Sequence, residues 1–399
     1  MDAIKSRQQY IQKQLKTGQA FILQQPKAKK RNNDVYYPFH PNRHFYYLTG
    51  LEEPNALLLI THDQVILWSE PNDPHRTLWE GKLMGEQALD LLMIDKWHSL
   101  HTVSETISNY LSPEIQLLSI ESIPDIPFKP TQSNDIRSLL DTMRLIKDPL
   151  EITYIKKACQ ISSAAHNSIM RHAKDLHHEG AIAGHFIKEI MCSGASSLAY
   201  PTISASGKNA CTLHYQRNNQ DINPDDLILV DAGCEYMQYA SDITRTFPAN
   251  GRFSPLQKDV YEAVLATQES TIKMCAPNIK MSDIHNHAVK EISQHLIDLK
   301  LLNCSLDEAI NEKLFMPFFP HKIGHTMGLD VHDTPLNDDI LQPGMVITIE
   351  PGIYISSPGQ LNGIGIRIED NILITQHGYD NLTKDAVKQV DDIEHMMSS

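Results

Sequence analysis

The sequence predicts an α+β protein of two domains, a small N-terminal α/β domain followed by a larger domain of helices and antiparallel strands. The chain has 399 residues, more than one ordinary domain contains. A proline-rich stretch without periodicity, residues 123–134, interrupts it. A helix-start signal at Asp148 then opens a series of helix-like and strand-like segments. We therefore expect domains at residues 1–130 and 148–399, with a linker at the boundary, residues 131–147.

The N-terminal domain mixes strand-like and helical segments. ALLLITHDQVILWS (56–69) has the composition of two strands that turn at His62 and Asp63. SETISNYLS (104–112) has the apolar spacing of a helix.

The second domain opens with a well-marked helix. Asp148 can cap its N-terminus, Pro149 takes the first helical position, and Glu151 falls at the third, as in a capping box. Apolar residues then recur at helical spacing. Further helices are expected near residues 179–193, 254–275 and 281–300. The expected strands are LILVDAG (227–233), YASDITRTF (239–247), GMVITIEPGIYI (344–355) and GIGIRIEDNILIT (363–375).

Composition and charge exclude several classes of function. A formal charge of −14 argues against a general nucleic-acid binder, because neutralising phosphates requires clustered Lys and Arg. No apolar run is long enough to span a bilayer, and the N-terminus lacks the apolar core of a signal peptide. The 6 cysteines form no CxxC pair. The cysteines are typical of reduced, mostly buried residues, so we expect a cytoplasmic protein. From the charge and the apolar runs, we expect neither nucleic-acid nor membrane partners.

Two aspartates stand at unusual places in the first strand pair. Asp231 ends the apolar run LILV, where an unpaired carboxylate is costly. If the chain turns near Tyr236 and Met237, Asp242 lies nearly opposite Asp231, and like charges placed there repel. A solvated surface hairpin is the alternative, which the apolar run disfavours. A shared cation explains the pair better.

The second strand pair repeats the anomaly. Glu350 ends the strand GMVITIE, while Arg367 and Glu369 project together from a strand whose opposite face is all isoleucine. A salt bridge between Arg367 and Glu369 is an alternative for these two alone. It leaves Glu350 and the aspartate pair unexplained. Four converging carboxylates would carry the charge that two divalent ions balance.

Three histidines crowd the stretch PHKIGHTMGLDVHD (320–333), namely His321, His325 and His332. Their spacing alone does not tell ligands from acid/base groups or packing histidines. A site of carboxylates with a single imidazole favours Mn²⁺ or a similar first-row ion.

The order Asp231, Asp242, His325, Glu350 and Glu369 along the chain resembles the five-ligand site of the pita-bread metallopeptidases. That family includes methionine aminopeptidase, prolidase and aminopeptidase P, with creatinase as a metal-free relative. DAGCEYMQYASDITRTFP, HKIGHTMGLDVHD, ITIEPGIYI and GIRIEDN look like its four signature blocks in the right order. YYPFHPNRHFYYLTGLEEPNALLLI (36–60) resembles the N-terminal domain of the aminopeptidase P type. The likeness runs from about residue 20 to the end of the chain.

The resemblance implies a C-terminal pita-bread (creatinase/aminopeptidase-like) catalytic domain and a role for each matching residue. The implied cofactor is two divalent ions, for which this ligand type favours Mn²⁺. The implied ligands are Asp231, Asp242, His325, Glu350 and Glu369. The implied catalytic residues are His214, His332, Glu350 and Arg367. The implied substrate-binding residues are His321, Tyr354 and Trp79, the last reaching toward a neighbouring subunit. The alternatives are loop packing near the metal for His321 and His332, strand packing for Tyr354 and core packing for Trp79.

The implied activity is that of an aminopeptidase that hydrolyses the N-terminal Xaa–Pro bond of peptides, with a metal-bridging hydroxide as nucleophile. Its partners would be peptides with proline at the second position, and the chain would form a homo-oligomer, a dimer or tetramer. One alternative is a prolidase, which cleaves Xaa-Pro dipeptides. Another is a non-catalytic pita-bread binding protein, which the intact set of five ligand types disfavours.

Overall fold

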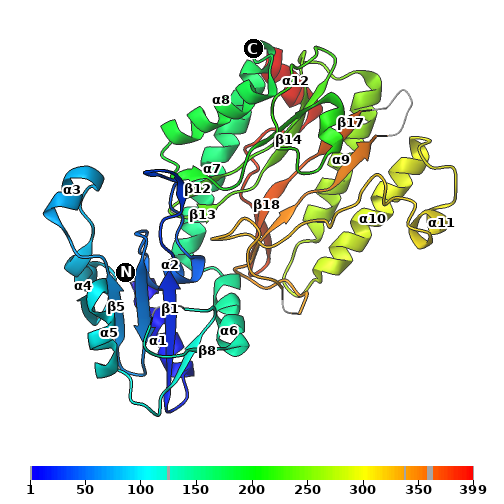
Figure 1. Cartoon of the computed structure of the whole chain (residues 1–399). Helices are drawn as coiled ribbons and strands as arrows, with labels where there is room; N and C mark the ends of the chain where they lie inside the picture. Colours follow the sequence, from blue (N-terminus) through cyan, green and yellow to red (C-terminus); the bar gives the residue numbers. More distant parts are fainter. Residues whose placement is uncertain (1, 124–125, 337, 357–362, 399) are drawn as a thin grey trace. The chain divides into compact units, whose positions relative to one another are not determined.

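The computed structural model describes residues 2–123, 126–336, 338–356 and 363–398. The chain divides into two compact units, one up to Arg144 and one from Leu145 onward, each built of helices and sheets (Figure 1). The predicted α+β class is confirmed. The division falls inside the segment 131–147, but this segment is no irregular linker, because helix α6 (Asn134–Leu145) fills most of it. The helix forms because its apolar residues recur on one face, which is buried.

The N-terminal unit is built on a six-stranded mixed sheet in the order β6-β5-β4-β1-β7-β8. Its strands are β1 (Gln19–Gln25), β4 (Ala56–Ile60), β5 (Val65–Ser69), β6 (Lys96–Ser99), β7 (Gln116–Ser119) and β8 (Thr131–Gln132), and a separate hairpin pairs β2 (Lys30–Asn32) with β3 (Val35–Tyr36). Its helices are α1 (Asp2–Gln14), α2 (Arg43–Thr49), α3 (Pro74–Glu80), α4 (Ala88–Leu91), α5 (Val103–Thr106) and α6.

The strands predicted from ALLLITHDQVILWS are confirmed as β4 and β5, which pair antiparallel and are buried along their whole length. The segment SETISNYLS forms short helical turns, α5 followed by a 3₁₀ turn at Ile107–Asn109.

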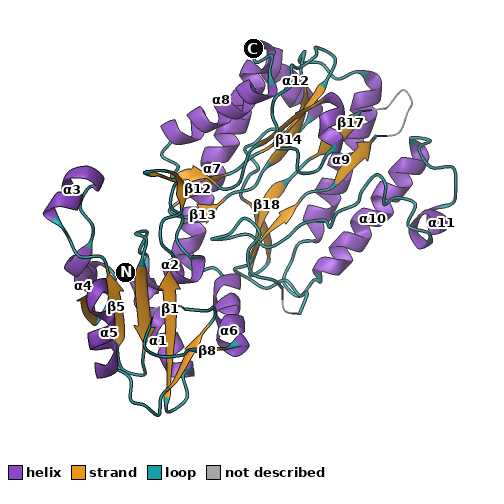
Figure 2. Ribbon diagram, viewed as in Figure 1, coloured by secondary structure: helices purple, strands orange, loops and turns teal. Residues whose placement is uncertain are grey.

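The second unit places long helices along the outside of short antiparallel sheets (Figure 2). Its helices are α7 (Pro149–His172), α8 (Glu179–Cys192), α9 (Pro255–Met274), α10 (Met281–Asp298), α11 (Leu306–Asn311) and α12 (Val390–Ser398). The predicted start of α7 is confirmed, because Asp148 and Glu151 form a capping box around Pro149. In the ranges that the structure describes, no helix has both the length and the apolar composition that a bilayer crossing requires.

Within the described residues of this unit, the strands form four small antiparallel sheets. One sheet contains β10 (Ile203–Ser206), β11 (Leu227–Asp231) and β14 (Thr244–Pro248), and a second contains β9 (Ser197–Leu198), β12 (Cys234–Tyr236) and β13 (Tyr239–Ala240). A third contains β15 (Val346–Ile349), β18 (Asp370–Thr375) and β19 (Gly378–Asn381). The fourth pairs β16 (Gly352–Ile355) with β17 (Ile364–Arg367). Isoleucines and valines from these strands share one core with the helices.

The register of the first aspartate pair differs from the prediction. The turn between β12 and β13 lies at Met237 and Gln238, both with positive φ, one residue later than expected. Asp231 pairs with Thr244 on β14, and Asp242 lies in the link between β13 and β14. The difference arises because the chain forms two short ladders in place of one continuous hairpin.

Candidate metal centre

The five predicted ligands line one cavity of about 480 Å³ in the second unit. Asp231 lies at the end of β11, and Asp242 lies in the link between β13 and β14. His325 lies in the loop after α11, while Glu350 and Glu369 follow β15 and β17. The cavity is also lined by four other predicted site residues, His214, His321, His332 and Arg367. Among the described residues, a second cavity of about 490 Å³, around residues 206–209 and 220–227, contains none of the predicted site residues.

Three of the predicted ligands form a tight group. Ligand atoms of Asp242, His325 and Glu369 all lie within 4.8 Å of one another. The Nε2 atom of His325 is 3.5 Å from a carboxylate oxygen of Asp242 and 3.5 Å from one of Glu350. A single imidazole among acids is a ligand set that suits divalent first-row ions.

Arg367 pairs with Asp231 in this structure. Its Nη2 atom lies 2.7 Å from Asp231 Oδ2, its Nη1 donates to the Tyr354 hydroxyl at 2.9 Å, and the side chain is 5% exposed. Glu369 instead accepts a hydrogen bond from the Thr244 hydroxyl at 2.7 Å. The alternative of a simple Arg367–Glu369 salt bridge is therefore wrong, since the arginine pairs with Asp231 instead.

The electrostatics of the site indicate an excess of negative charge. Burial raises the pKa of Glu350 to about 7, and burial with the neighbouring acids raises the pKa of Glu369 and of Asp242. Burial alone would lower the pKa of His325, but its hydrogen bond to Asp242 and the charge of Glu350 raise it to about 9. Raised pKa values on neighbouring buried carboxyl groups show that these acids repel one another and lack a compensating positive charge, so the residues fit divalent cations.

The histidines differ in their surroundings. The His325 and His332 rings lie with centroids 4.0 Å apart, and His332 is exposed toward the cavity. His321 Nε2 lies 2.9 Å from the Tyr354 hydroxyl. Burial and the nearby Arg367 lower the pKa of His321 to about 4, so this ring is neutral at pH 7. His321 and Tyr354 thus belong to one polar network that continues through Arg367 to Asp231.

Trp79 lies in the N-terminal unit, on α3, and is 75% exposed. The alternative of core packing for this residue is therefore wrong.

Tyr200 is the most prominent residue that the sequence did not single out. Its hydroxyl lies 2.7 Å from Asp231 Oδ1 and also contacts Asp242 Oδ1, so it joins the two aspartates across their different ladders. Gly233 allows the close approach of these segments, because a Cβ there would lie 1.8 Å from the carbonyl oxygen of Ser241. The only signal for Tyr200 is its place in the segment before β10, which carries no charge pattern.

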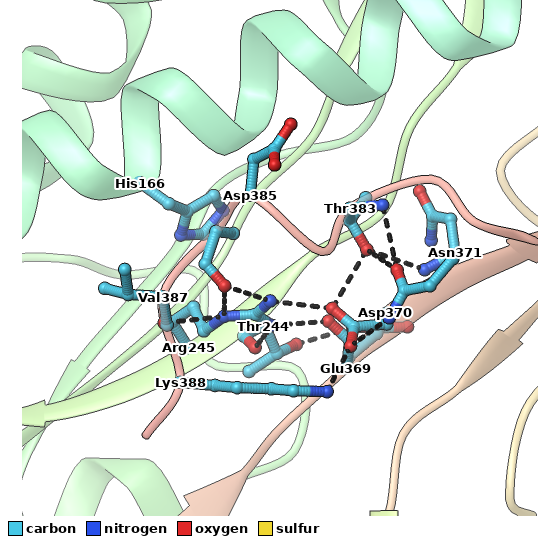
Figure 3. Close-up of polar contacts among 12 residues, drawn as sticks. His166, Thr244, Arg245, Glu369, Asp370, Asn371, Thr383, Asp385, Val387 and Lys388 are labelled. Atoms are coloured by element: carbon cyan, nitrogen blue, oxygen red, sulfur yellow. Dashed lines mark hydrogen bonds and ion pairs between the residues drawn. The ribbon is translucent and has the colours of Figure 1, made fainter. Parts of the chain in front are cut away.

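Next to the carboxylates lies a second charge cluster, centred on the fully buried pair of Arg245 and Asp370 (Figure 3). Asp370, next to Glu369, accepts hydrogen bonds from Arg245, Lys388, Gln268, Asn381 and Thr383. Arg245 also donates to the carbonyl oxygens of Glu369 (2.6 Å) and Thr244 (2.9 Å). The cluster thereby fixes the backbone on which Glu369 is carried.

Asn371 performs the same task for the other side of the site. Its side-chain amide donates to the carbonyl oxygen of Asp242 and accepts from the Asp242 N–H at 2.9 Å. Three consecutive residues, Glu369, Asp370 and Asn371, therefore supply a ligand candidate and two supports.

Comparisons with known proteins agree with this architecture. Residues 153–376 match metallopeptidase family M24, and residues 4–118 match the aminopeptidase P N-terminal domain. The Xaa-Pro aminopeptidase of Haemophilus influenzae is 37% identical over 96% of this chain and 94% of that protein, and that of Escherichia coli is 33% identical over 98% and 96%. The structure of aminopeptidase P from E. coli with the inhibitor Pro-Leu matches with a TM-score of 0.94, at 32% identity, over 100% of this chain and 98% of that one. The chain therefore belongs to metallopeptidase family M24 and carries an N-terminal domain of the aminopeptidase P type.

Proposed function

We propose that this protein is an Xaa-Pro aminopeptidase that uses two divalent metal ions. The observation that carries the proposal is the group formed by Asp242, His325 and Glu369, which lines a cavity together with Asp231 and Glu350. Full-length similarity to proteins named Xaa-Pro aminopeptidase supports the same activity.

The metal ions would be held by Asp231, Asp242, His325, Glu350 and Glu369, with Asp242 and Glu369 shared between them. Mn²⁺ is the ion we propose, because oxygen ligands with one imidazole suit it. When bound, such ions would lower the pKa of a water molecule, so that hydroxide is available near neutral pH, and would polarise the scissile carbonyl.

The protein's own residues position the substrate and move protons. We assign to Glu350 the transfer of the water proton to the leaving nitrogen. His332 stabilises the negative charge that develops on the carbonyl oxygen, with His214 beside the substrate in the same cavity. Arg367 holds Asp231 and Tyr354, and Tyr354 orients His321 toward the substrate.

Proline at the second position must be recognised by shape, because its nitrogen has no N–H to donate. The cavity offers apolar surface for a ring from Pro201, Ile203, Leu213 and Val331. Trp79 would contribute from a neighbouring copy in a homo-oligomer. That assembly, and a cytoplasmic location, stay predictions from the sequence.

A peptide panel tests the proposal. We expect kcat/KM with Mn²⁺ to be highest for Xaa-Pro-Yaa and longer peptides, which release the first residue. Xaa-Pro dipeptides and Xaa-Ala-Yaa peptides should be clearly poorer. A preference for the dipeptide would indicate a prolidase. No hydrolysis by protein with verified metal would favour a binding protein, and indifference to proline would refute both proline-specific activities.

A further inference from the structure

A buried ion pair lies beside the loop that carries His332. Lys147 Nζ is 3.1 Å from Asp333 Oδ2, and each side chain is 1% exposed. Lysine is rarely buried this completely. A buried pair of this kind contributes little net stability compared with an apolar pair of the same shape. Its presence here therefore calls for an explanation other than stability.

The fold leaves space for this pair at Gly328. A Cβ at that position would lie 2.2 Å from Asp333 Oδ2 and 2.8 Å from Lys147 Cε. The Gly328 backbone is held on both sides, since its N–H donates to the Asp330 carbonyl and its carbonyl accepts from Ala240 N–H at 2.8 Å. Any side chain here would displace the ammonium group or the carboxylate.

The pair closes one end of a short loop, residues 326–334, which we call the histidine loop. Asp333 N–H donates to the Thr326 carbonyl at 2.9 Å, and the Thr326 hydroxyl donates to the Thr334 carbonyl at 2.7 Å. Thr326 in turn forms a bridge to Ile347 on β15. The loop is thus tied at its base to the strand that leads to Glu350.

Lys147 is itself fixed in place. Its N–H donates to the Gly344 carbonyl at 2.9 Å, and its ammonium group also donates to the Leu145 carbonyl at 3.3 Å. It directly precedes the capping box of α7. Asp333 is therefore anchored to a rigid point outside the histidine loop.

His332 is the residue before Asp333, and the two side chains have different surroundings. Asp333 is buried against Lys147, while His332 lines the cavity with its ring 4.0 Å from that of His325. Fixing Asp333 fixes the peptide unit that it shares with His332.

We propose that the Lys147–Asp333 pair is a positioning device that holds His332 at the reacting atoms. The proposal rests on the role given to His332 in the proposed function. A displacement of about 1 Å in such a group can lower turnover by about a hundredfold.

The test uses the double variant K147M/D333N, which removes both charges of the pair at nearly constant shape, so that neither member is left facing the other's uncompensated charge. We expect kcat on an Xaa-Pro-Yaa peptide to fall by at least about tenfold, with KM and bound Mn²⁺ within about twofold of the parent. In an H332A background, the same two substitutions should lower kcat by less than about twofold, because the histidine that the ion pair positions is already absent. The matched control is K156M/D380N, which removes an exposed ion pair and should change nothing.

An equal loss of kcat with and without His332 would overturn the proposal, as would loss of Mn²⁺ or of folded protein in parallel with kcat. A second measurement does not depend on catalysis. In protein labelled with ¹³C at histidine Cε1 and loaded with diamagnetic Zn²⁺ in place of paramagnetic Mn²⁺, the resonance that H332A removes should shift or broaden in K147M/D333N and stay unchanged in K156M/D380N. A parent without Xaa-Pro hydrolysis would defeat the proposed function alone, and an unmoved His332 resonance would defeat the positioning device.

Discussion

Arg245 Nη2 lies 2.6 Å from Asp370 Oδ1, and neither side chain has any exposed surface. Because Asp370 follows Glu369 directly, this pair joins the metal-centre candidate to the interior of the domain. We predict that D370N destabilises the protein by about 3–5 kcal/mol, since it leaves the fully buried Arg245 without its counter-charge and removes the charge that Lys388 faces. Urea unfolding measures the loss. The control D385N changes an exposed aspartate nearby and should cost less than about 0.5 kcal/mol.

The same pair predicts the direction of a pH effect. Burial acts to raise the pKa of Asp370, but Arg245 and Lys388 hold it well below its ordinary value of 3.8. Its contribution to stability is therefore fully present above about pH 4 and is lost as the pH falls toward the folded-state pKa. Below about pH 4, the difference in free energy of unfolding between the parent and D370N should therefore shrink by about 1.4 kcal/mol per pH unit. A gap that is constant from pH 7 to pH 3 would contradict this account.

The second prediction concerns the carboxylates proposed to be shared by both ions. E369Q and D242N should each lower kcat/KM by at least about a hundredfold and reduce bound Mn²⁺, because an amide keeps the shape but not the charge. Metal analysis and peptide assays check this together. E262Q, at an exposed position on α9, serves as the control. Activity within a few-fold of the parent in either variant would remove the two-metal proposal.

The third prediction separates the two neighbouring histidines. H325A should chiefly lower bound Mn²⁺, since His325 Nε2 lies 3.5 Å from a carboxylate oxygen of both Asp242 and Glu350, close enough to bind the same ion. H332A should chiefly lower kcat at unchanged occupancy, because its role is confined to the transition state. H377A, at an exposed histidine, should change neither quantity. Equal metal loss in H325A and H332A would mean that both are ligands.

Much of this site could be predicted because its acids contradict their surroundings. A carboxylate at the end of a buried apolar strand, as at Asp231, needs a partner whatever the register, and alternation alone puts Arg367 and Glu369 on one face. The capping signal at Asp148 is equally local and was correctly identified.

What could not be predicted depends on long-range pairing. The division of the first hairpin into two ladders moved Asp242 out of register with Asp231, and no local pattern encodes that division. Tyr200 reaches both aspartates from a segment 31 and 42 residues away. The Lys147–Asp333 pair spans 186 residues. Contacts of this kind carry no periodicity, so only the folded chain reveals them.

The last prediction links metal binding, stability and pH. In the metal-free protein the pKa of Glu350, at about 7, and those of Glu369 and Asp242 lie above the unfolded values, chiefly through burial. These carboxyls hold protons that the unfolded chain has released, so metal-free stability falls as the pH rises from about 4.5. His325, whose pKa is about 9, adds stability below pH 6.5 that is lost toward pH 9. Both effects lower the stability of the metal-free protein as the pH rises.

Bound Mn²⁺ replaces these protons, so its stabilising effect should grow with pH. We expect the rise in Tm on adding saturating Mn²⁺ to chelator-treated protein to be larger at pH 8 than at pH 5.5. In E350Q, which removes one of the titrating groups, the difference between the two pH values should shrink. A Tm that does not respond to verified metal loss would show that the acids do not form a cation site. A response that is larger at pH 5.5 would mean that the metal binds elsewhere, because proton competition at these acids can only oppose binding at low pH.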